Sequence, residues 1–127
     1  MKLILPTVVS VFSVSLFLPM VFGQTISGEP AAGKVVYEKH CMACHGLHGK
    51  GDGPTGKAIQ PPAADFTSAR SKKKSPTDLR TVIEEGRANT AMAAWMRRLS
   101  DEEIQHVLAY VLSLRNEQAP SGQSRRE

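Results

Sequence analysis

The stretch Cys41-Met42-Ala43-Cys44-His45 decides how the rest of the chain must fold. Two residues separate the cysteines, so one turn of chain can present both thiols to adjacent vinyl groups of one haem. The histidine follows at once and projects from the same face, where its imidazole can bind the haem iron. The stretch therefore predicts one covalent haem c, attached through Cys41 and Cys44, with His45 as the proximal iron ligand.

Three other interpretations of this motif are weaker. A thioredoxin-like C-x-x-C site needs a preceding strand, and no alternation of apolar and polar residues precedes Cys41. A structural zinc site needs four ligands, and although His40 and His48 lie nearby, no second C-x-x-C or H-x-x-H follows. A structural disulfide, the usual state of two cysteines in an oxidising compartment, leaves the adjacent histidine unexplained.

The N-terminus predicts export. Lys2 precedes an acid-free apolar run from Leu3 to Phe22, and Gly23 offers a small residue for cleavage before Gln24. We interpret residues 1–23 as a secretory signal peptide. The alternative is a retained membrane anchor, because about 20 mostly apolar residues just span a bilayer. Either form places the folded part in the periplasm, free after cleavage or anchored to the membrane.

The exported part is short of large apolar side chains. Of the 52 apolar residues in the 127-residue chain, 15 lie within the first 23, and 13 of the remaining 37 are alanine. Twenty-four larger apolar side chains are few for a domain of about 100 residues, which is already marginal in the surface that it buries. We therefore expect the haem to supply much of the core. The composition excludes a large multidomain enzyme, a multi-span membrane protein and a disulfide-dense scaffold.

The exported chain shows no repeat and no strand pattern, so we expect an all-α fold of three to four short helices. A first helix begins near Pro30, and the Gly- and Pro-rich residues 46–62 form a loop. A basic run in a polar loop follows, with Arg70, Lys72, Lys73 and Lys74. We divide the chain into a signal peptide (1–23), a polar lead-in (24–29), a haem domain (30–116) and a flexible polar tail (117–127).

Two later helices carry clear start signals. Ser75-Pro76-Thr77-Asp78 places a capping serine before a proline, and Gly86 ends this helix. Ser100-Asp101-Glu102-Glu103 is a capping box with acids in the first turn of the last helix. The last helix has one apolar stripe at helical spacing, which consists of Ile104, Val107, Leu108, Val111, Leu112 and Leu114.

The far face of the iron needs a second donor or an open position. Met1 and Met20 leave with the signal peptide, and Met42 lies between the attached cysteines on the proximal side. Met92 and Met96 remain, 47 and 51 residues after His45, and one of the two must be core filler.

Histidine is the rival donor on this face. His106 lies roughly opposite the apolar stripe of the last helix, so we expect it to face solvent. His40 and His48 lie too near the attachment site to swing across the haem. Methionine is therefore the better candidate.

From about Pro30 to Leu114 the chain resembles the class I monohaem cytochromes c of one bacterial branch. The resemblance is carried by four segments of the chain. They are Gly33 and Tyr37 before the haem motif, Gly51-Asp52-Gly53-Pro54, Pro61-Pro62-Ala63-Ala64-Asp65-Phe66, and Met92-Ala93-Ala94-Trp95 with the last helix after it. The resemblance implies the cytochrome c fold, in which the N- and C-terminal helices cross, here with the Gly33/Tyr37 face near Tyr110.

The resemblance also bears on the two axial ligands. In such proteins the methionine ligand is usually followed by a proline, one further residue and an aromatic residue. Met92 fits this register with Trp95, although Ala93 replaces the proline, and Met96 does not fit. The resemblance further implies that a loop proline carbonyl orients His45, with Pro54, Pro61 and Pro62 as candidates.

A haem with two axial donors has no vacant position for a substrate, so we expect single-electron transfer and no enzymatic activity. An electron carrier between periplasmic or membrane-bound redox partners is the main hypothesis. The alternatives are a haem subunit of a larger respiratory or dehydrogenase complex, and a gas sensor or peroxidase-like enzyme whose methionine ligand is labile.

The charge of the chain limits its partners. The formal net charge of +4 is small, and for an exported protein it argues against nucleic acid as a partner. A basic rim of Arg70, Lys72, Lys73 and Lys74, with Arg97 and Arg98, would steer an acidic redox partner. We expect a monomer if the protein is soluble.

Overall fold

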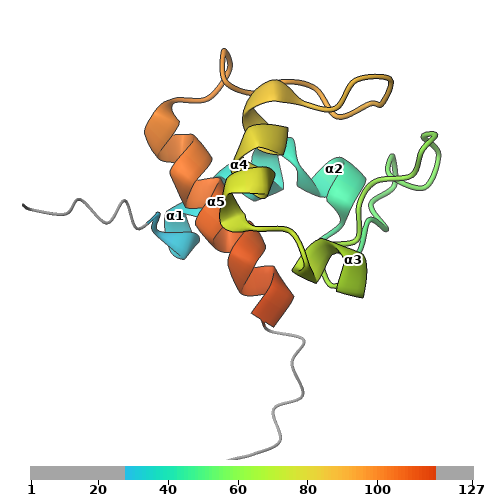
Figure 1. Ribbon diagram of the computed structural model, residues 1–127, viewed down its shortest axis with the longest axis horizontal. Helices are drawn as coiled ribbons and strands as arrows, with labels where there is room; N and C mark the ends of the chain where they lie inside the picture. The colour runs from blue at the N-terminus through green and yellow to red at the C-terminus, as the bar shows by residue number, and fades with distance from the viewer. Residues whose placement is uncertain (1–27, 117–127) are drawn as a thin grey trace, which may run out of the picture.

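The computed structural model describes residues 28–116; the expected signal peptide, most of the polar lead-in and the polar tail lie outside these residues. The described part is helical and contains no strand. Its helices are α1 (Pro30–His40), α2 (Met42–His45), α3 (Ala69–Lys72), α4 (Pro76–Glu85) and α5 (Asp101–Asn116). α1, α4 and α5 have 11, 10 and 16 residues, whereas α2 and α3 are single turns of four residues (Figure 1). The expected all-α fold is therefore confirmed.

The crossing of α1 over α5 organises the fold. A Cβ atom at Gly33 would lie 1.9 Å from the carbonyl oxygen of His106 and 3.0 Å from Cβ of Tyr110, so only glycine permits this approach. One turn later Tyr37 is fully buried, and its ring meets that of Tyr110 edge-on at 5.1 Å. The crossing implied by the resemblance is therefore present where it was expected.

Both predicted capping patterns form. The Ser75 hydroxyl accepts from the Asp78 N–H while the Asp78 carboxylate accepts from the Ser75 N–H, and Gly86 ends α4 with φ of 73°. Ser100 and Glu103 make the same reciprocal pair at the start of α5, at 3.1 and 2.8 Å. Local sequence signals thus set where α4 and α5 begin.

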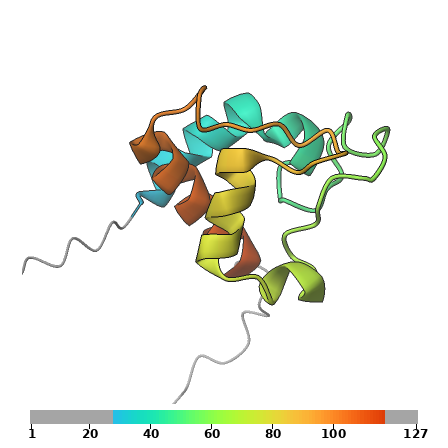
Figure 2. The same ribbon diagram turned by 45° about the horizontal axis from the view of Figure 1, so that its top comes forward.

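The buried core is small. The apolar side chains of α5 that face inward come from its predicted apolar stripe, and they pack against α1 and α4. The main buried cluster consists of Tyr37, Leu79, Val107, Val111 and Leu114. The Gly- and Pro-rich loop and the segment after α4 extend to the same side of these helices, as two views of the chain show (Figures 1 and 2).

The basic run contains a helical turn that the sequence did not predict. Ser68 caps α3 by accepting a hydrogen bond from the N–H of Ser71. Arg115, at the end of α5, is buried and donates to the carbonyl oxygens of Ser71 at 2.5 Å and Lys74 at 3.1 Å. These bonds tie the turn to α5, which is why a segment rich in lysine and arginine becomes ordered.

The expectation that His106 faces solvent is wrong. Its side chain is 21% exposed, and its Nδ1 accepts from the N–H of Glu29 at 2.8 Å. The close approach of α1 to α5 brings the start of α1 over this ring.

Within residues 28–116, no helix has both the length and the apolar character to cross a membrane.

Replacing Gly33 with alanine tests how tight the crossing is. Helix propensity alone would make Gly33→Ala stabilising by about 1 kcal/mol. Because the new Cβ meets backbone of α5, we expect destabilisation by about 1–3 kcal/mol instead. Urea unfolding of the haem-loaded protein measures the difference. Val35→Ala, on the exposed face of α1, is the control and should stay within about 0.5 kcal/mol. A more stable Gly33→Ala protein would contradict the tight crossing.

Candidate functional site

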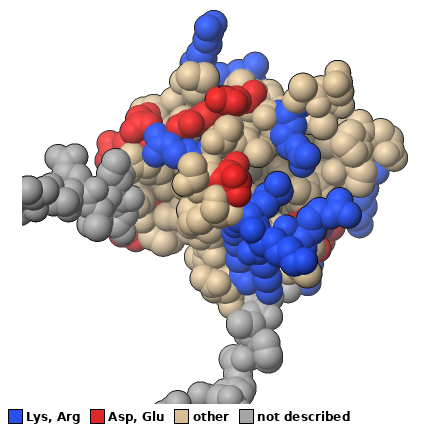
Figure 3. Space-filling view, viewed as in Figure 1, with Lys and Arg blue, Asp and Glu red and all other residues tan. Residues whose placement is uncertain are grey.

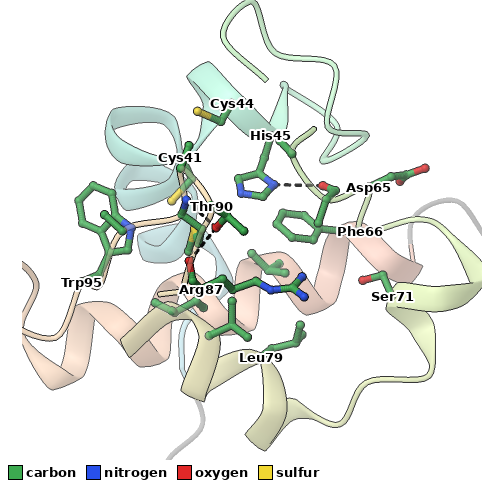
Figure 4. Close-up of a pocket in the computed structure, with 18 of the residues that line it drawn as sticks. Cys41, Cys44, His45, Asp65, Phe66, Ser71, Leu79, Arg87, Thr90 and Trp95 are labelled. Carbon is green, nitrogen blue, oxygen red and sulfur yellow. Dashed lines mark hydrogen bonds between the residues drawn. The ribbon is translucent and has the colours of Figure 1, made fainter. Parts of the chain in front are cut away.

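A cavity of about 630 Å³ opens between the haem motif, the loop after it and the segment after α4. Its volume falls within the range of about 300–1,000 Å³ that cofactor sites occupy. The walls include the core residues Leu79, Val107 and Val111, so the cavity is continuous with the hydrophobic core. Figure 4 shows the side chains that converge on it from these three parts of the chain.

The motif lies at the junction of α1 and α2 and presents its functional side chains to this cavity. Cys41, Cys44 and His45 all line it (Figure 4). A hydrogen bond fixes the end of the motif, because the buried hydroxyl of Tyr37 donates to the carbonyl of Gly46 at 2.6 Å. Gly46 ends α2 with φ of 78°, a conformation that favours glycine.

The two cysteines are free thiols, and both face the cavity. Burial raises the pKa of Cys41 to about 11, and the neighbouring Cys44 adds to the effect. A redox-active C-x-x-C site needs the opposite shift, toward a reactive thiolate. A thioredoxin-like site also needs a strand before the motif, whereas α1 precedes it here, so that interpretation does not fit.

The imidazole of His45 is oriented by two contacts. Its Nδ1 lies 3.1 Å from the carbonyl oxygen of Ala64, and Phe66 stacks on the ring at 4.5 Å with the planes 16° apart. A carbonyl at Nδ1 requires the proton there, which leaves the Nε2 lone pair available as a metal donor. Burial lowers the pKa of His45, and the Ala64 hydrogen bond offsets this in part, so the ring favours the neutral form that a metal ligand needs.

The expected proline acceptor for His45 is wrong: the acceptor is the carbonyl of Ala64. Pro54 does not line the cavity. It follows Gly53, which packs on the carbonyls of Met42 and Ala43 in α2. Pro61 and Pro62 line the cavity further along the loop. A Cβ at Gly51 would lie 2.3 Å from the carbonyl oxygen of Ala63, so a glycine there lets the chain pass close to the motif just where Ala64 meets the ring.

Met92 lines the same cavity from the segment after α4, whereas Met96 does not line it and is 58% exposed. The segment is ordered by its own hydrogen bonds. The Arg87 N–H donates to the Met92 carbonyl at 3.0 Å, the Thr90 hydroxyl donates to the Arg87 carbonyl, and the Met92 N–H donates to that hydroxyl. These bonds hold the segment where Ala93 replaces the proline of the family pattern.

His40 also lies at the cavity, which the sequence did not predict. It lines the cavity, and its ring packs on Trp95 at 5.2 Å. His40 is the last residue of α1 and directly precedes Cys41, which also lines the cavity. His48 and His106 do not line the cavity. Among residues 28–116, no group of three or more His, Cys, Asp or Glu side chains could hold a metal ion, so the zinc interpretation lacks its ligands.

These observations fit a haem c. Two free thiols, an imidazole with its Nε2 unengaged and a thioether line one largely apolar cavity that is continuous with the core. This is the donor set that covalent attachment and two-sided ligation of haem iron require.

Comparison with known proteins leads to the same cofactor. Residues 28–111 match the family described as cytochrome C oxidase, cbb3-type, subunit III. Cytochrome c-554(547) of Halothiobacillus neapolitanus is 30% identical over 96 residues, covering 70% of this chain and 100% of that protein. The cbb3-type oxidase subunit CcoP of Azospirillum brasilense is 34% identical over 91 residues, covering 72% of this chain and 30% of the subunit.

A solved structure agrees with these relatives. The Kuenenia stuttgartiensis reducing HAO-like protein complex contains a chain with a TM-score of 0.60 and 33% identity, over 80% of this chain and 49% of that one. The family match covers the helix crossing, the motif and the cavity, and the motif supplies the two cysteines that covalent haem requires. The chain therefore belongs to the c-type cytochromes of the cbb3-type subunit III family, with haem c as its cofactor.

Proposed function

We propose that this protein carries single electrons between periplasmic or membrane-bound redox partners. Cys41 and Cys44 would hold the haem, and His45 and Met92 would be its axial ligands. One observation carries the proposal: the motif and Met92 line the same cavity, so both proposed iron donors lie where the haem would bind. Bound haem would supply an iron that changes between the ferric and ferrous states.

The residues around the cavity suit this role. Ala64 and Phe66 hold the His45 ring in one orientation, so the proximal side needs little rearrangement when the charge of the site changes. The hydrogen bonds of the segment that contains Met92 do the same on the other side. The apolar walls exclude water and so favour the redox state with the smaller charge. A fixed thioether donor argues against the gas-sensor hypothesis.

A second candidate function is a haem subunit of a larger respiratory complex. The similarity to CcoP, which is a subunit of a cbb3-type oxidase, favours it. Fractionation separates the two candidates. Membrane association that survives high salt would indicate a complex subunit or a retained anchor, whereas release as a soluble monomer would indicate a shuttle.

Four residues of the basic rim support an acidic redox partner: Arg70, Lys72, Lys73 and Lys74. Lys and Arg side chains gather on the face of the molecule that carries α3 (Figure 3). Arg70, Lys72 and Lys73 are exposed, and Arg70 and Lys74 also line the cavity. A partner that docks on this rim would therefore meet the protein beside the haem site.

Exchanging each methionine tests the axial ligand. Met92→Ala removes the donor from the cavity, so we expect loss of the ferric absorption band at the red edge of the visible spectrum. The reduced form should then bind carbon monoxide rapidly, because one iron position is open. Met96→Ala is the matched control and should keep the band. Loss of the band in Met96→Ala, with retention in Met92→Ala, would reverse the assignment.

Removing both thiols tests the contribution of haem to the core. Cys41→Ala/Cys44→Ala cannot attach haem, and its small cluster of buried side chains would surround an open cavity. We expect low helix content and no cooperative transition in a thermal melt followed by circular dichroism. Met92→Ala, which keeps both thiols, should retain a cooperative melt. Native-like helix content in the double variant would show that the chain folds without its cofactor.

Reversing the charges of two exposed lysines of the basic rim tests whether a partner docks there. Lys72→Glu/Lys73→Glu should slow electron transfer to an acidic redox protein about tenfold or more at low salt, and the difference should shrink as ionic strength rises. Stopped-flow kinetics over a range of salt concentrations measure this. Lys34→Glu/Lys39→Glu makes the same charge change on the exposed side of α1 and should have a smaller effect. Equal effects of the two double variants would indicate that net charge alone determines the rate of electron transfer.

A further inference from the structure

Arg115 is a buried cation that does not itself line the haem cavity. It lies near the end of α5 and is 7% exposed, and no carboxylate within residues 28–116 forms an ion pair with it. Its Nε is buried without a hydrogen-bond partner among these residues. Burial of a charge without a counterion costs free energy, so the bonds that the guanidinium does make have to offset that cost.

The bonds of Arg115 all go to one short stretch of chain. Its Nη2 donates to the carbonyl oxygen of Ser71 at 2.5 Å, and its Nη1 donates to the carbonyl oxygen of Lys74 at 3.1 Å. These carbonyls lie at the end of α3 and just beyond it, where a helix leaves carbonyl groups without regular partners. One planar guanidinium with several donors can bridge both carbonyls at once.

The segment from Ser68 to Lys74 has little else to hold it in place. α3 has four residues, far fewer than an isolated helix needs for stability. Among residues 28–116, α3 shares no broad contact surface with another helix, and Ser71 is its one buried residue. The segment also carries like charges that repel one another, on Arg70, Lys72, Lys73 and Lys74. The bridge from Arg115 is therefore the main tie between this segment and the core helices.

The same segment forms one wall of the cavity. The residues of the segment that line the cavity are Ser68, Arg70, Ser71 and Lys74. Figure 4 shows Ser71 on the side of the cavity away from Trp95. Nη2 of Arg115 also lies 3.3 Å from the Ser71 hydroxyl, so the guanidinium lies directly behind this wall. If the segment moved outward, water would enter the cavity from this side.

We infer that Arg115 is a positioning residue, which holds residues 68–74 as a closed wall of the haem cavity by bridging the carbonyls of Ser71 and Lys74. The inference deepens the proposed function and rests on it, because the wall would keep water from the haem that carries the electron. Water stabilises the ferric state, which has one positive charge more than the ferrous state. A closed wall therefore raises the midpoint potential, and Arg115 acts on that potential through the segment that it holds.

The test removes the bridge from the haem-loaded full chain. Arg115→Gln takes away the guanidinium and its charge. Arg115→Lys keeps the charge, but its single nitrogen cannot reproduce the planar fork that reaches both carbonyls. Arg80→Gln is the matched control, because Arg80 also links two helices, through its bond to Asp101 of α5, and does not line the cavity.

Limited digestion with trypsin reports the wall, because the segment contains four cleavage sites, after Arg70, Lys72, Lys73 and Lys74. A protease cuts such sites when the chain opens locally, and mass spectrometry of the fragments gives the rate at each site. We expect cleavage in the segment to be about tenfold faster in both Arg115 variants, because charge-assisted bonds to the carbonyls are lost. Potentiometric titration should give both variants a lower midpoint potential. Arg80→Gln should keep the cleavage rate in the segment and the potential of the unmodified protein.

Unchanged cleavage of the segment in both Arg115 variants would overturn the inference. Fast cleavage with an unchanged potential in Arg115→Lys would also overturn it, because the charge and not the closed wall would then set the potential. If Arg115→Gln fails to acquire haem, Arg115→Lys still decides. The proposed ligation is tested separately: absence of the ferric band at the red edge of the visible spectrum from the unmodified protein would contradict Met92 as ligand, whereas the cleavage rates do not depend on that band.

Discussion

The buried hydrogen bond from the Tyr37 hydroxyl to the Gly46 carbonyl links the two parts of the fold on which everything else depends. On one side the Tyr37 ring packs on Tyr110, in the crossing that Gly33 permits. On the other side its hydroxyl holds the turn that ends the haem motif. The position of α1 on α5 therefore sets the orientation of the two thiols and the imidazole. Burial raises the pKa of Tyr37, so the hydroxyl stays protonated and able to donate.

The same constraint explains why a chain with so few large apolar residues folds in this way. The buried cluster fills only the space between α1, α4 and α5, and four of its members also form a wall of the cavity: Tyr37, Leu79, Val107 and Val111. A ligand in the cavity would cover these side chains from the other side. The shortage of large apolar side chains in the sequence therefore corresponds to the open wall of the core. A covalent haem would cover that wall without further side chains.

Features encoded by local patterns could be predicted from the sequence. The caps at Ser75 and Ser100 and the motif itself depend on residues within one helical turn of one another. The acceptor of His45 could not be predicted, because every residue has a carbonyl and the path of the long glycine-rich loop decides which one arrives. Arg115 resembles an ordinary basic residue at a helix end, and only its bonds to the carbonyls of Ser71 and Lys74 make it a buried anchor.

The segment that contains Met92 shows how such a site can keep its geometry without the proline of the family pattern. A proline fixes φ covalently, at no cost in contacts elsewhere. Here Gly86 turns the chain, and the bonds among Arg87, Thr90 and Met92 close a compact loop in its place. Each such bond contributes about 1 kcal/mol, so several weak bonds together hold the loop. Arg87 takes part in this loop through its backbone and reaches the cavity with its side chain.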